Sequence, residues 1–126
     1  MKRVWFAAAL LLLLAGSGIL VSGTIGRLVD HSMSLINDAE ALVRQDNFKA
    51  AGTVCAEAAD HWKGHNKTFS AFLRHDETDA VEISIARLQV FADIGDKDDF
   101  LALCVELLEE LRHIRDMEKP LPWNIM

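Results

Sequence analysis

The sequence has no tyrosine, only two prolines and only two cysteines among its 126 residues. Both prolines, Pro120 and Pro122, lie close to the end of the chain, so no ring without an N–H interrupts a helix upstream of them. Two cysteines form one disulfide at most, which excludes a disulfide-rich scaffold. Alanine, leucine, glutamate and aspartate dominate instead, and this composition favours α-helix.

Basic residues are also scarce. There are 13 Lys and Arg against 19 Asp and Glu, and the formal net charge is -6. A nucleic-acid partner needs a basic surface, so this class of partner is excluded. There is no glycine-rich phosphate loop and no arrangement of Ser, His and Asp that supports nucleophilic catalysis. We therefore predict that the chain is not an enzyme and needs no cofactor.

The clearest feature that is present lies at the start of the chain. Lys2 and Arg3 precede an uncharged run, residues 4–23, which is rich in Leu and Ala. As a helix this run is about 30 Å long, enough to cross the hydrocarbon core of a bilayer. We predict that residues 1–23 form a membrane anchor and that residues 4–23 contact the lipid.

Charges on the two sides of the apolar run predict its orientation. Lys2 and Arg3 precede the run, whereas Arg27 is the only Lys or Arg between the run and Arg44. The positive-inside rule then keeps the N-terminus in the cytoplasm and sends the rest outside. The prediction is a single-pass protein of the cell membrane with an extracytoplasmic C-terminal domain.

A cleaved signal peptide is the alternative interpretation of the same run. Residues 1–3 would be its charged region and residues 4–14 its apolar region, with cleavage after Ser17 or Gly23. Apolar residues resume at 19–21, which makes the run long for a signal peptide and adequate for a span. The anchor is therefore favoured, and cleavage would leave a secreted domain.

Apolar residues at three- and four-residue spacing predict amphipathic helices along the rest of the chain. These helices are expected at 24–45, 48–73 with a break near Gly64, about 76–94, and 97 to about 116. The first of them continues the apolar run without a proline, so the two can form one rod. The predicted fold class is all-α: an N-terminal transmembrane helix, then a small antiparallel bundle of three to four helices. The bundle would occupy residues 24–119, followed by an apolar tail at 120–126.

Histidine spacing suggests a second function. His61 and His65 are four residues apart and share one side of a helix, which is a spacing that can hold a metal. His75 and Asp76 are the further ligands of this hypothesis, a metal- or small-ligand-binding domain. Residues 62–64 lack the glutamate of a zinc-protease helix. The alternative is structural: polar residues that flank a core tryptophan near a helix break.

The two cysteines, Cys55 and Cys104, occupy equivalent positions in the second and fourth predicted helices. These helices run parallel in an up-down bundle, so the two thiols are expected at the same height. Outside the cytoplasm a disulfide would persist there and close a long loop. Both residues also lie on apolar stripes, where a free cysteine behaves as a small hydrophobic residue. Both interpretations stay open at this point.

Apolar side chains that are not needed to fill the core of the bundle are the predicted contacts for a partner. Trp62, with its neighbours, and Trp123 are the foremost of them. The partner would be another membrane protein or a second copy of the chain. The predicted function is a non-enzymatic interaction or accessory module, held outside the cytoplasmic membrane.

Short motifs spread over nearly the whole chain resemble one known family. They are Trp62 and His65, His75-Asp76-Glu77, Ala86-Arg87-Leu88, Gly95-Asp96-Lys97, Leu111-Arg112-His113-Ile114 and Asn124-Ile125-Met126. Together with the basic start, the apolar run and the acidic helical domain, they resemble domain-of-unknown-function family 4363 (DUF4363). The resemblance implies a membrane-attached helical protein without an assigned activity, and it gives the disulfide no support.

Overall fold

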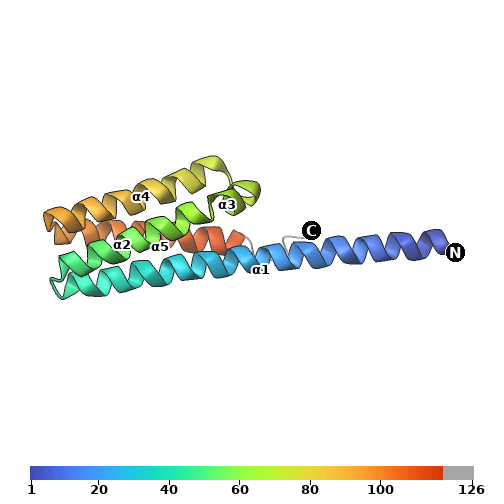
Figure 1. Ribbon diagram of the computed structural model, residues 1–126, viewed down its shortest axis with the longest axis horizontal. Helices are drawn as coiled ribbons and strands as arrows, with labels where there is room; N and C mark the ends of the chain where they lie inside the picture. The colour runs from blue at the N-terminus through green and yellow to red at the C-terminus, as the bar shows by residue number, and fades with distance from the viewer. Residues whose placement is uncertain (118–126) are drawn as a thin grey trace.

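The structure, a computed structural model, describes residues 1–117, and of residues 17–22 and 72 only the backbone. Its helices are α1 (Lys2–Arg44), α2 (Phe48–Gly64), α3 (Asn66–Phe72), α4 (His75–Ile94) and α5 (Lys97–Met117). The helices α1, α2, α4 and α5 form an antiparallel bundle in which α2 lies diagonally across from α5 (Figure 1). The prediction of an all-α chain with a helical bundle is confirmed.

The first helix, α1, is a single 43-residue helix that extends far beyond the bundle (Figure 1). Its buried stripe begins at Ile25 and continues at helical spacing to Val43. Upstream, the large apolar side chains from Val4 to Leu14 are each at least 60% exposed. Among the residues that the structure describes, no helix has a stretch both long and apolar enough to cross a membrane. The rod predicted from the lack of proline is present as one unbroken helix.

Short turns join the helices at the end of the bundle far from the N-terminus (Figure 1). The side chain of Asn47 caps α2 by accepting a hydrogen bond from the amide of Ala50 (3.3 Å). Asp96 caps α5 in the same way, with the amide of Asp99 as donor (3.2 Å). Gly95 ends α4 with φ +70°, a left-handed conformation that glycine adopts without strain. These residues explain why the helix boundaries could be predicted closely.

The predicted helix break near Gly64 is confirmed, and the side chain of Trp62 makes contacts across it. The helix α2 ends at Gly64, and α3 begins at Asn66. The rings of Trp62 and Phe69 stack with centroids 4.1 Å apart and planes 18° from parallel. The Nε1–H of Trp62 donates a hydrogen bond to the carbonyl oxygen of Thr78 (3.2 Å). Trp62 therefore connects α2 to both α3 and α4.

Candidate functional site

Three imidazole rings meet where α1 packs on α2. The ring centroid of His61 lies 4.5 Å from that of His31 and 4.7 Å from that of His65. The sequence pairs His61 with His65 by helical spacing, and the contribution of His31 was missed. A signal for it exists, because His31 and His61 lie at equal distances along the chain from Asp46. An antiparallel turn centred there brings the two histidines opposite each other.

Backbone carbonyls determine which ring nitrogens of this histidine cluster carry protons. The Nε2 of His61 lies 3.1 Å from the carbonyl oxygen of Leu28, and Nδ1 of His65 lies 2.9 Å from that of His61. A carbonyl only accepts, so both nitrogens are donors in these contacts. Burial lowers the pKa of His61; the hydrogen bond to Leu28 raises it, and the neighbouring His31 and His65 lower it. The net effect favours the neutral imidazole.

The predicted metal ligands do not come together as a set. His61 and His65 are neighbours, but His75 lies at the start of α4, and Asp76 pairs with Arg74 (3.4 Å). In residues 1–117, as far as their side chains are described, no group of three or more His, Cys, Asp or Glu residues is placed to hold a metal ion. Metal binding at these residues stays a prediction.

Cys55 and Cys104 are free thiols, and both are fully buried. Their helices, α2 and α5, run parallel as predicted but occupy diagonal corners of the bundle (Figure 1). The two thiols still lie near enough for Cys55 to contribute to the raised pKa of Cys104. In the structure both pack as small hydrophobic groups in the core. A disulfide between them stays a prediction.

The tryptophans predicted as partner contacts have different outcomes. Trp62 is fully buried, so the prediction that it contacts a partner is wrong. The reason is that α3 folds Phe69 onto its ring while Thr78 accepts its N–H. Trp123 and the tail at 120–126 lie outside the described residues. A surface for a partner must therefore be sought elsewhere on the bundle.

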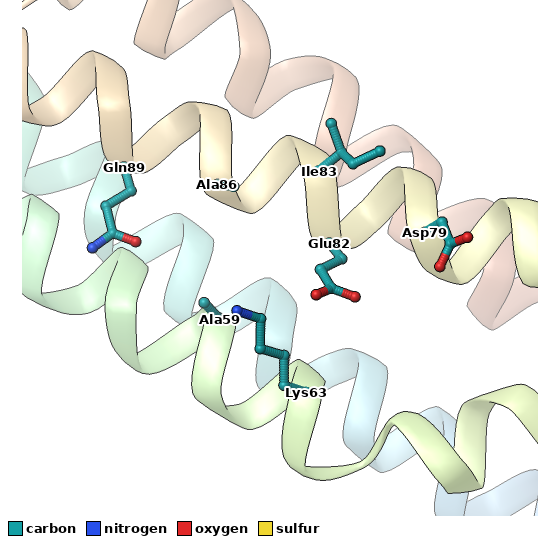
Figure 2. Close-up of a pocket in the computed structure, with 7 residues that line it drawn as sticks. All are labelled: Ala59, Lys63, Asp79, Glu82, Ile83, Ala86 and Gln89. Carbon is teal, nitrogen blue, oxygen red and sulfur yellow. The ribbon is translucent and has the colours of Figure 1, made fainter.

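An open groove runs along the outside of the bundle between α2 and α4 (Figure 2). It is lined by Ala59, Lys63, Asp79, Glu82, Ile83, Ala86 and Gln89. Figure 2 shows the side chains of Glu82 and Lys63 extending into the gap from opposite walls, while Ile83 points away from it. Charged side chains thus enter the groove from both walls, and its α4 wall adjoins an apolar surface.

That surface belongs to α4, a helix that is apolar on two sides. One side, from Thr78 to Ala92, is buried in the core. On the opposite side Ile83, Val90 and Ile94 are 60%, 54% and 67% exposed, and Ala86 is exposed between the first two. We call these four residues the outer face of α4. Single exposed apolar residues are ordinary, whereas a row at helical spacing indicates an interaction site.

Fold and surface together define a small four-helix-bundle protein carried on a long apolar helix. The chain belongs to DUF4363, a domain of unknown function, whose family model matches residues 19–125. The resemblance seen in the sequence motifs is thereby confirmed. No curated protein and no solved structure matches the chain.

The histidine cluster predicts a pH-dependent stability. Because the folded protein lowers the pKa of His61, the unfolded chain binds its proton more readily. We expect the free energy of unfolding to fall as the pH drops below about 6.5, towards the lower pKa of the folded state. Above that pH, His61 does not change the free energy of unfolding with pH. Urea denaturation at about pH 7.5 and about pH 5.5 measures the effect.

The variant His61→Gln should flatten this dependence, since its amide cannot be protonated in this range. His113→Gln is the matched control because His113 is exposed on α5, and it should leave the dependence as it is. An unchanged pH dependence in His61→Gln would contradict the assignment.

Proposed function

We propose that the chain is a non-enzymatic interaction module, tethered to the cytoplasmic membrane by α1, with its bundle on the outer side. The observation that carries this proposal is the exposed apolar half of α1. Its large side chains from Val4 to Leu14 have no protein core to pack against in the described residues. Exposure of such a surface to water is unfavourable by about 25 cal/mol per Å².

The distribution of these side chains favours lipid over a single protein partner. Leu10–Leu14 are five consecutive residues and therefore point to all sides of the helix, and all are exposed. A helix that is apolar all round is typical of a membrane span, whereas one that docks on a protein is apolar on one stripe. The uncharged run continues in the sequence through residues 17–22, whose side chains lie outside the described part.

The continuity of α1 supports a fixed relation between tether and bundle. No turn separates the apolar half from the bundle half, which starts at Ile25. The basic residues Lys2 and Arg3 at the start favour a cytoplasmic N-terminus by the positive-inside rule. The bundle would then stand upright outside the membrane, with the turn at Asp46 as its far end.

The role as an interaction module is supported by the outer face of α4. The interior of the bundle is filled by fully buried large side chains such as Trp62, Phe100 and Leu107. The groove beside α4 is open, and Glu82 and Lys63 extend into it from opposite walls. Exposed apolar rows of this kind serve in contacts with other helices.

Membrane attachment is tested by charge placed in the apolar run. We expect the full chain to stay with membranes in alkaline carbonate and Leu11→Arg/Leu13→Arg to be released. Each arginine near the middle of a span costs about 2.5–3.5 kcal/mol of insertion free energy. Protease added to intact cells should digest the bundle. Protease added to inside-out membrane vesicles, in which the outer face of the membrane is enclosed, should leave the bundle intact.

Val105→Arg is the matched control, because Val105 is 59% exposed on α5 and should tolerate the charge without release. The intact mass of the native product tests the alternative of cleavage after Ser17 or Gly23. Recovery of the full-length chain, with residues 1–23 intact, in the soluble fraction would contradict the proposal.

A further inference from the structure

From the outer face of α4 we infer that two copies of this chain pair side by side, α4 against α4, in parallel. This inference rests on the proposed membrane tether and names its partner. Of the large apolar side chains that are exposed on the described part of the bundle, Ile83, Val90 and Ile94 share this one face. A second copy covers them with the same residues, as in any two-fold symmetric contact.

The direction of pairing follows from the tether. In Figure 1, α1 and α4 run in the same direction along the bundle. Two copies with α1 in one membrane, inserted in the same sense, have parallel α1 helices. Their α4 helices are then parallel as well, and the two-fold axis stands along the membrane normal. Each residue of the face then lies near its own counterpart in the other copy.

The charges beside the face suit a parallel pair. Ile83, Ala86 and Val90 follow the three- and four-residue spacing of a coiled-coil seam, with β-branched residues at the positions that favour two strands. Glu82 and Arg87 flank this seam on opposite sides. In a parallel pair such flanking residues, five positions apart, meet across the interface. Glu82 of each copy therefore faces Arg87 of the other.

Within the chain, Glu82 and Arg87 have charged neighbours, but no ion pair between described residues includes either of them. Glu82 extends into the groove opposite Lys63. Arg87 lies near enough to Asp99 to hold down the pKa of that carboxyl, which a hydrogen bond to a neighbouring aspartate raises. Arg87 is exposed, and its guanidinium carbon lies 5.9 Å from the ring centroid of Phe91. Since no ion pair of the described residues holds either charge, both side chains can turn toward a partner along the seam.

The size of the face explains why the tether matters. A seam of about three turns buries less than the roughly 800 Å² per partner of a stable soluble dimer. Two chains confined to one membrane with their helices aligned meet at a raised effective concentration and in the correct orientation. A contact that is weak in solution is then sufficient.

Cysteine cross-linking of the full chain in membranes of expressing cells tests the inference. In Val90→Cys, mild oxidation should give a disulfide-linked dimer as the main product, and Ile94→Cys should do the same. Val105→Cys is the control: it is similarly exposed (59%, against 54% for Val90) but lies on α5, and should stay monomeric. The native thiols are buried and do not compete.

Charge reversal in the Val90→Cys background tests the flanking pairs. Glu82→Arg and Arg87→Glu alone each place like charges opposite each other twice per dimer and should weaken pairing about tenfold. The double variant restores opposite charges and should recover the cross-link. A double variant as weak as the single ones would overturn the parallel register.

Carbonate extraction of the same sample separates the two proposals. A membrane-bound chain without a dimer at residue 90 overturns the inference and leaves the tether standing. A chain that carbonate releases, yet cross-links at residue 90, retains the pairing and overturns the tether. A cross-link from residue 90 to a heavier, different protein shows that a second copy is not the occupant.

Discussion

Replacing Trp62 by alanine is expected to lower the free energy of unfolding by about 3–5 kcal/mol, the usual cost of removing a buried large aromatic side chain. Trp62 is fully buried and stacks on Phe69, and its N–H is bonded to Thr78. Its loss opens a cavity at the point where α2, α3 and α4 meet. Urea denaturation of the full chain in detergent micelles, followed by circular dichroism, measures the change.

Trp62→Phe separates the two contributions of this side chain. It keeps a ring to stack on Phe69 but loses the hydrogen bond, for which we expect a cost of about 1–2 kcal/mol. Lys63→Ala, at the next and exposed position of α2, should change stability by less than about 0.5 kcal/mol. An alanine variant within about 1 kcal/mol of the unmodified chain would show that the contact has little weight.

The second large effect concerns the cysteines, whose alkylation in the folded chain should be about a thousandfold slower than that of an exposed cysteine. Burial raises the pKa of Cys55 from 9.0 to about 12, and nearby Asp93 raises it as well. Burial likewise raises the pKa of Cys104 to about 12. Only the thiolate reacts, so the reactive fraction at about pH 8 falls about tenfold for each unit by which the pKa is raised. Timed iodoacetamide labelling with intact mass detection measures the rates.

Val105→Cys supplies the exposed reference in the same chain, and it should be labelled at an ordinary rate. In urea without reductant, both native thiols should be labelled. Absence of labelling in urea would instead reveal a disulfide between Cys55 and Cys104. Rapid labelling of the folded chain would show that the thiols are not enclosed by the bundle.

Helix positions were predictable because local chemistry determines them. Asn47 and Asp96 are side chains that cap helices, and Gly95 adopts the left-handed conformation that ends one. The buried stripe from Ile25 to Val43 follows the spacing of one helical face. Each of these signals acts within a few residues, so one sequence is sufficient to find it.

The candidate sites were less predictable because they join residues far apart in the chain. His31 meets His61 only because the turn at Asp46 folds α1 onto α2. Trp62 is enclosed by Phe69 of α3 and Thr78 of α4, and neither contact can be read from the spacing within α2. The outer row of α4 was overlooked because its core row accounts for an amphipathic helix by itself.

By itself the sequence determined the all-α class, the helix ends, the core stripes, the apolar start and the family. These properties follow from hydrogen-bond capping, side-chain periodicity and composition, which are local along the chain. Only the tertiary structure decided that the two thiols lie on diagonal helices, that Trp62 is enclosed, and that one face of α4 stays uncovered. These depend on which helices become neighbours, and packing between distant segments determines that.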